Sequence, residues 1–226
     1  MNNTKSKKEI YKVMNVNLLK QKFDIVLNAY KNERHDINIE LMNVDTKKLE
    51  ASYGKMPTSL KDLLTNFGAI FIDGRIDENI KLNCNRIDCR FDDSSLSVCK
   101  EHLVDLFYDV EEDLDELLKE DIDRMVEEDE DYGRYNALLK YGYPLTTYYE
   151  DCPILLDVHT NAENPPVYYM NTEGSCSKLA DNLEDYMNAL LDNGCFTWYP
   201  SEKKLTKEDL KSLDIDFSNI KEEVGC

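Results

Sequence analysis

The order of the predicted elements indicates an α+β protein. Amphipathic helical segments stand at both ends of the chain, strand-like runs cluster after Gly68, and two further strands precede the last strong helix. Elements that segregate in this way, instead of alternating strand and helix, are typical of α+β folds. With 226 residues, of which 42% are hydrophobic, the chain is long enough to bury a sizeable core.

The N-terminal segment predicts one amphipathic helix and then an extended stretch. Within residues 17–32, large apolar side chains recur at helical spacing: Leu18, Leu19, Phe23, Val26, Leu27 and Tyr30. Residues 35–45 alternate polar and apolar side chains, which fits a short strand or a linker. We expect residues 1–45 to form a helical extension ahead of the main domain.

Two short helices separated by a proline are expected next. The first ends near Gly54, and the second follows Pro57 and stops at Gly68. Ser59 and Asp62 stand three residues apart, as in a capping box, in which two side chains satisfy the free N–H groups of a helix start. We therefore expect Ser59 to cap the second helix.

The remaining elements form a strand-rich middle of the chain, which is followed by a helical end. We expect strands at residues 69–76, 80–91, 96–104, 152–159 and 165–172. A strong amphipathic helix is predicted at residues 182–194. Thr206 and Asp209 form a second capping-box pattern, so a short helix should follow them.

An acidic segment in the middle of the chain carries most of the net charge. From Asp105 to Asp131 there are 15 acids and two bases, whereas the whole chain has a net charge of −19. Apolar residues nevertheless recur at helical spacing in this segment: Val110, Leu114, Leu117, Leu118, Ile122, Met125 and Val126. Like charges four residues apart destabilise a helix by roughly 0.2–0.5 kcal/mol per pair, so the apolar face has to offset them by packing. We expect a docked helix over about residues 103–130.

The charge balance disfavours some partners and favours others. With 46 acids and 27 bases, the chain lacks the excess of Lys and Arg that phosphate contacts require, so we expect neither nucleic acid nor membrane as a partner. No stretch approaches the roughly 18 apolar residues of a membrane span. The polar N-terminus and seven irregularly spaced cysteines fit free thiols in a reducing cytoplasm. A basic protein is the natural counterpart of such a chain.

Reactive side chains occur without a recognisable catalytic or metal-binding signature. Four possible zinc ligands lie close together, namely Cys84, Cys89, Cys99 and His102. Their spacing departs from zinc-finger patterns, so buried thiols are favoured, and whether they bind a metal stays open. Asp157 and His159 share one face of a predicted strand, as in a hydrolase dyad, but no motif accompanies them. We predict no enzymatic activity and no cofactor.

Two segments share an ordered set of features with one family. The first is marked by Leu49, Glu50, Gly54, Met56, Pro57, Leu60, Leu63, Leu64 and Gly68. In the second, a strand with an acidic residue precedes a strand containing Val-Tyr-Tyr, and the helix at residues 182–194 follows. Together they resemble the SUKH superfamily over roughly residues 46–192, with a poor fit between residues 75 and 150.

The resemblance implies a more detailed architecture. It predicts a single mixed, mainly antiparallel sheet flanked by helices, to which this chain adds the acidic helix. We expect the SUKH-like α+β domain at residues 46–200, with the acidic helical insertion at about 103–131, and a C-terminal helical extension at residues 201–226. Most bacterial members neutralise a cognate toxin, often a nuclease, and fungal relatives regulate cell-wall assembly as interaction modules. Neither branch has a recognised catalytic site.

Resemblance and charge together predict a cytoplasmic immunity protein that binds and neutralises a basic toxin. The alternative is a non-enzymatic intracellular scaffold or regulatory module without a toxin partner. The acids expected to contact the partner are Asp109, Glu111, Glu112, Asp113, Asp115, Glu116, Glu120, Asp123, Glu127 and Glu128. The other interpretation of these acids is a solvated helix face. The sequence leaves the oligomeric state open.

Overall fold

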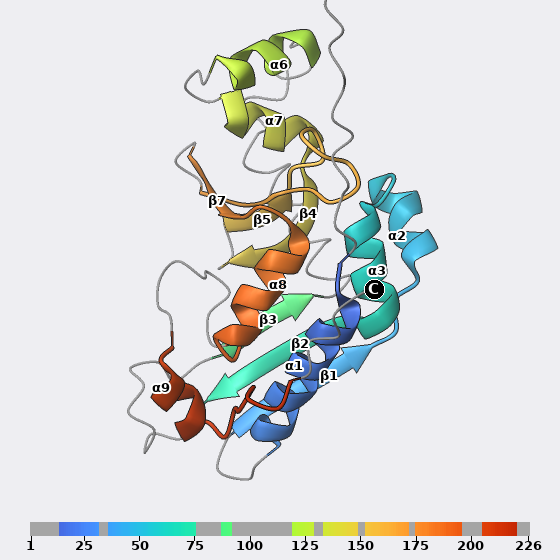
Figure 1. Cartoon of the computed structure of the whole chain (residues 1–226). Helices are drawn as coiled ribbons and strands as arrows, with labels where there is room; N and C mark the ends of the chain where they lie inside the picture. Colours follow the sequence, from blue (N-terminus) through green and yellow to red (C-terminus); the bar gives the residue numbers. More distant parts are fainter. Residues whose placement is uncertain are drawn as a thin grey trace, which may run out of the picture.

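The chain folds into helices and two antiparallel sheets in the computed structural model (Figure 1). The structure describes residues 14–31, 36–75, 87–91, 119–128, 133–148, 152–171, 175–195 and 205–220. Within these residues, helices and strands are segregated along the chain in the order that the sequence predicts. The α+β class is therefore confirmed.

The first sheet has three strands in the order β1-β2-β3. They are β1 (Asp36–Met42), β2 (Ala69–Arg75) and β3 (Ile87–Phe91). The segment that fitted either a strand or a linker is thus a strand, and it pairs with β2 along its whole length. Ile39 lies opposite Ile72, and both pack on the main hydrophobic core.

The second sheet has four strands in the order β4-β5-β6-β7. They are β4 (Tyr143–Tyr148), β5 (Cys152–Leu156), β6 (Val167–Met170) and β7 (Cys176–Ala180). Every pair is antiparallel and joins strands that are neighbours in the sequence. The expected strands at residues 152–159 and 165–172 are present as β5 and β6.

The expectation of a single mixed sheet is wrong, because the described strands form two separate sheets without a parallel pair. A parallel pair needs a crossover connection, whereas within each sheet the described strands pair with their neighbours along the chain. At the start of the second sheet, Pro144 deprives β4 of a backbone N–H donor. The pairing of β4 with β5 also shifts register between Pro144 and Thr146. Both features are typical of a strand at a sheet edge.

One hydrophobic core joins both sheets to the helices. Three helices pack together over it, α1 (Val16–Tyr30), α3 (Thr58–Phe67) and α8 (Leu183–Asp192). Phe23 of α1 meets Phe67 of α3 edge to face, with ring centroids 5.8 Å apart. Figure 1 shows α1 and α8 lying over the sheets, so their apolar faces close the core from one side.

The predicted capping box of α3 is wrong. Residue Pro57 occupies the cap position, and Ser59, already inside the helix, is buried. The loop before β6 replaces the missing cap: the Glu163 carbonyl accepts a hydrogen bond from the Ser59 N–H at 3.0 Å, and the Glu163 carboxylate accepts one from the Thr58 hydroxyl. A distant loop has taken over a role that the sequence assigns to a local side chain.

The second capping box is confirmed at α9 (Lys207–Ser212). The Thr206 hydroxyl accepts a hydrogen bond from the Asp209 N–H at 3.1 Å, and the Asp209 carboxylate accepts one from the Thr206 N–H at 2.9 Å. Beyond the helix, Leu213 and Ile215 insert into the main core. The capped helix therefore holds the C-terminal segment against the body of the protein.

Replacing Gly68 by alanine should destabilise the fold more than replacing Gly54. Both glycines have backbone angles that only glycine adopts readily, φ +72° and ψ −165° at Gly68, and φ +87° and ψ −172° at Gly54. A Cβ at Gly68 would lie 2.2 Å from the carbonyl oxygen of Met42, whereas one at Gly54 meets nothing within 4 Å. Backbone strain alone costs roughly 1–3 kcal/mol. Urea unfolding followed by circular dichroism should give this loss for Gly54→Ala and a larger one for Gly68→Ala; equal losses would contradict the close approach of β1.

Candidate functional site

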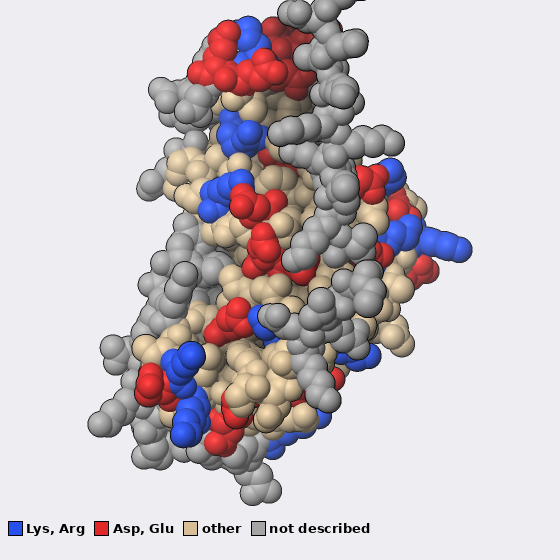
Figure 2. Space-filling model, in the orientation of Figure 1, with Lys and Arg blue, Asp and Glu red and all other residues tan. Residues whose placement is uncertain are grey.

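The described end of the acidic segment is a helix with acids outside and an apolar residue inside. Helix α6 (Lys119–Glu127) buries Ile122 completely, while Glu120, Glu127 and Glu128 are exposed. In Figure 2, acidic side chains gather over α6 at the upper end of the molecule. For this part of the chain, the predicted separation of a docked apolar face from an exposed acidic face is present.

Several predicted residues lie outside the described part of the chain. These are the acids Asp109, Glu111, Glu112, Asp113, Asp115 and Glu116, and the candidate ligands Cys84, Cys99 and His102. Among the described residues there is no group of three or more His, Cys, Asp or Glu that could hold a metal ion. No helix within that same part is long and apolar enough to cross a membrane.

Helix α6 rests on α7 (Gly133–Tyr141), which in turn rests on the second sheet. Leu138 of α7 packs against Leu155 and Met170 in an apolar cluster separate from the main core. Figure 1 shows the order plainly, with α7 between α6 and strands β4 and β5. The two helices form a hairpin at the end of the molecule opposite α9 (Figure 1). We call it the acidic hairpin after the exposed acids of α6, because α7 itself contributes Arg134 and Lys140 and no acid.

A histidine ties this hairpin to the turn after β5. The Nε2 atom of His159 lies 2.7 Å from a carboxylate oxygen of Asp123, and only 8% of the His159 side chain is exposed. The ring of Tyr141 stacks on that of His159, with centroids 5.1 Å apart and planes 19° from parallel. One nearly buried imidazole therefore contacts α6, the end of α7 and the turn.

A second contact holds the start of α7. The side chain of Asp157 is 1% exposed, and its carboxylate accepts hydrogen bonds from the Arg134 guanidinium and from the Thr160 hydroxyl at 2.7 Å. The Thr160 N–H adds a third hydrogen bond at 3.2 Å to the other carboxylate oxygen. A buried carboxylate is stable only when it is paired and hydrogen-bonded in this way.

Together these side chains form a polar anchor between the acidic hairpin and the second sheet. Its members are Asp123, Arg134, Tyr141, Asp157, His159 and Thr160. The sequence drew attention to Asp157 and His159 as a possible dyad, but their partners differ: Arg134 and Thr160 occupy the oxygens of Asp157, and His159 faces Asp123. The arrangement supports a structural clamp and offers no base aligned with a nucleophile.

Two further titratable side chains, Cys176 and Tyr168, lie near the anchor. Burial raises the pKa of the Cys176 thiol, so the protonated and weakly nucleophilic form dominates at neutral pH. Burial likewise raises the pKa of the Tyr168 phenol, while the Arg134 guanidinium, 5.7 Å from the Tyr168 ring centroid, opposes this shift. Burial therefore favours the uncharged form of both side chains.

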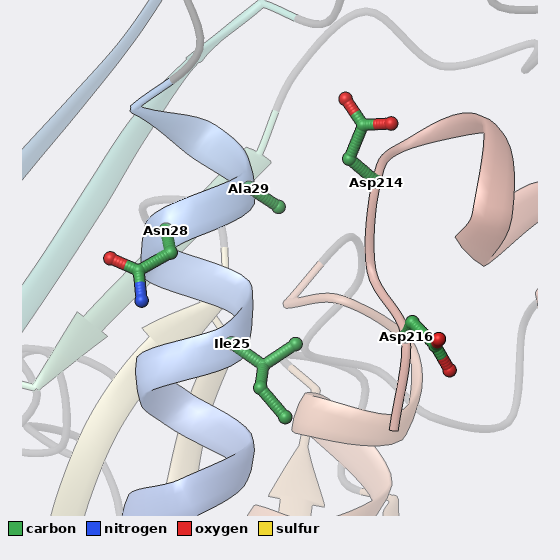
Figure 3. A pocket seen from close by; sticks show the side chains of 5 residues that line it. All are labelled: Ile25, Asn28, Ala29, Asp214 and Asp216. Atoms are coloured by element: carbon green, nitrogen blue, oxygen red, sulfur yellow. The ribbon is translucent and has the colours of Figure 1, made fainter. Parts of the chain in front are cut away.

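A pocket of about 320 Å³ lies at the other end of the molecule, between α1 and the C-terminal segment (Figure 3). Ile25 and Ala29 point from the helix toward the segment that carries Asp214 and Asp216. The Asp216 carboxylate accepts a hydrogen bond from the Ser218 N–H at 2.9 Å, and hydrogen bonds from Ser218 lower its pKa. This aspartate therefore stabilises its own turn.

These observations define an α+β domain in which helices pack over antiparallel sheets and the polar anchor acts as a structural clamp. The sequence matches the model of the SMI1 / KNR4 family (SUKH-1) over residues 42–189, well over half of the chain. The chain belongs to this family, which confirms the resemblance over roughly residues 46–192. Comparisons with curated proteins and with solved structures found no match.

The first family-like segment has a structural role. Helix α2 (Thr46–Tyr53) places Glu50 beside Lys61 of α3, and the Lys61 ammonium donates to both carboxylate oxygens at 3.1 and 3.0 Å. This hydrogen bonding lowers the pKa of Glu50. Leu49 and Met56 are buried in the main core. The segment therefore joins the two helices through one surface ion pair and two buried side chains.

Loss of Arg134 should destabilise the protein, because it leaves the buried carboxylate of Asp157 without its countercharge. We expect Arg134→Met to lower the free energy of unfolding by about 2–4 kcal/mol, toward the lower end for a pair in which the arginine is partly exposed. The double variant Arg134→Met/Asp157→Leu removes both charges and should lose less than the single variant. Urea unfolding of the two variants checks this; unchanged stability of Arg134→Met would contradict a stabilising anchor.

Proposed function

We propose that this protein is a cytoplasmic immunity protein, which binds a basic toxin domain and blocks its active site. Membership of the SMI1 / KNR4 family and a net charge of −19 support this proposal. A toxin that acts on nucleic acid has a basic cleft, because it must hold phosphates. An acidic helix entering such a cleft replaces those phosphates.

The observation that carries the proposal is the way in which the exposed acids are held. Asp123 and His159 bind α6 to the turn after β5, and the Arg134–Asp157 pair holds α7 beneath it. Acids on an ordered helix lose less conformational freedom on binding than acids on a loose segment. Their field also raises the rate at which a basic partner is encountered.

The acids of α6 have different roles in this proposal. Glu120 and Glu127, together with Glu128 directly after the helix, are exposed and contact the partner directly. Asp123 is half-buried and engages His159, so it positions the helix. Arg124 lies 2.9 Å from Glu128 and neutralises part of the charge, a surface ion pair that a basic partner can displace at little cost. The acids predicted as contacts between Asp109 and Glu116 lie outside the described residues and stay a prediction.

The alternative function, a scaffold or regulatory module without a toxin, also fits the family. Co-expression separates the two functions. If the protein is an immunity protein, co-expression with the product of the adjacent gene should relieve growth arrest by that product, and the two proteins should co-purify as a stoichiometric complex. Continued growth arrest together with the absence of a complex would overturn the immunity function and leave the scaffold.

Charge reversal on α6 should slow association with that toxin and flatten its salt dependence. Exposed interface charges act mainly on the association rate, so we expect Glu120→Lys/Glu127→Lys to reduce this rate by about tenfold or more at low salt. The measurement is biolayer interferometry at several NaCl concentrations.

A matched control changes the net charge by the same amount elsewhere. Asp24 on α1 and Glu208 on α9 are exposed. Figure 1 shows both of these helices far from α6. The variant Asp24→Lys/Glu208→Lys should keep an association rate close to that of the unmodified protein. Equal slowing in both variants would show that net charge alone, and not the α6 surface, directs binding.

A further inference from the structure

The two sheets protect their outer edges differently. An unpaired edge strand invites other strands to bind, and proteins usually prevent this with lysine, proline or a bulge. Strand β7, at the edge of the second sheet, has such features: its pairing with β6 shifts register between Val167 and Tyr168, and Lys178 is exposed. This edge is poorly suited to regular pairing.

Strand β1, at the edge of the first sheet, lacks these features. It pairs with β2 over seven consecutive residues without a register shift, and its sequence DINIELM contains no lysine, arginine or proline. No other strand of the described residues pairs with its outer side, and Figure 1 shows β1 at the margin of the molecule. Alternate backbone N–H and C=O groups of β1 therefore point away from β2.

The same strand carries the exposed large apolar side chains of the described residues. Leu41 is 52% exposed and Met42 is 38% exposed. Both lie at the C-terminal end of β1, where they pair with Ile70 and Ala69 of β2. An open edge and adjoining apolar surface together are typical of a site at which another strand is added.

We propose that β1 pairs antiparallel with β1 of a second copy of this chain, which joins two three-stranded sheets into one continuous sheet. The register that overlaps all seven residues places Ile39 opposite Ile39 of the second copy. It also places Ile37 opposite Leu41, Asn38 opposite Glu40, and Asp36 opposite Met42.

This register is self-complementary. Its apolar residues meet apolar residues on the side of the sheet that carries Ile39, and neither Asp36 nor Glu40 meets another acid. Cross-strand pairs of this kind are the unit of sheet stabilisation, whereas like charges directly opposite each other are unfavourable. A second copy is therefore a better occupant than an arbitrary strand, because the sequence of β1 complements itself over its full length.

The proposed dimer is independent of the immunity function and responds to salt in the opposite direction. Each copy carries a net charge of −19, so the two copies repel each other. Raising NaCl from about 0.05 to 0.5 M screens this repulsion and should strengthen the dimer. The same change should weaken a complex with a basic toxin. The two proposals can therefore fail separately.

Sedimentation velocity of the full chain over a range of protein and NaCl concentrations tests the dimer. We expect a concentration-dependent dimer that becomes tighter with salt. In the dimer, Met42→Glu places the new glutamate of each copy opposite Asp36 of the other copy. These two repulsive contacts should raise the dissociation constant by roughly 2- to 30-fold. Adding Asp36→Lys makes both contacts attractive and should restore the dimer.

Two controls keep the test specific. Ser177→Glu adds the same charge to the exposed edge strand β7 and should leave the dimer almost unchanged. Circular dichroism checks that each variant is folded. Because Met42 and Asp36 are exposed, we expect their substitution to leave the fold intact. A monomer at every concentration and salt level would overturn the proposal. So would a dimer that Met42→Glu does not weaken, or one that the second substitution does not restore.

Discussion

The buried carboxylate of Asp157 is the constraint on which the acidic end of the molecule depends. A charge that is 1% exposed at the end of an apolar strand is unstable alone, and Arg134 and Thr160 supply what it needs. Because Arg134 belongs to the first turn of α7, satisfying Asp157 also fixes where that helix begins. Helix α6 then packs on α7, so the place of the acidic surface follows from the burial of one aspartate.

Charge and folding oppose each other in the acidic segment, and α6 shows how the conflict is settled. Complete burial of Ile122 provides the hydrophobic gain, and His159 engages one acid that would otherwise add to the repulsion. The exposed acids gain little from the fold itself, because water and salt screen them. The acids therefore still repel one another. A basic partner relieves this repulsion when it binds, which contributes favourably to the free energy of binding.

Local signals were predictable from the sequence, and long-range partners were not. The faces of α1 and α8 and the capping box at Thr206 depend on residues within a few positions, so periodicity and spacing reveal them. The cap of α3 comes from Glu163, about a hundred positions away, and the division into two sheets depends on pairing that no single strand encodes. At the candidate site, the sequence drew attention to the acids, to Asp157 and to His159, whereas no pattern in the sequence singled out Arg134.

The proposed dimer and the proposed toxin surface use different sheets of one fold. Strand β1 belongs to the first sheet, and the acidic hairpin rests on the second, so pairing through β1 leaves both hairpins of a dimer accessible. Two accessible hairpins make binding bivalent toward any partner that presents two basic sites within reach. Salt then acts on the two associations in opposite directions, since it screens repulsion between acidic copies and attraction to a basic partner. The net charge that favours the partner is therefore also what keeps self-association weak at low ionic strength.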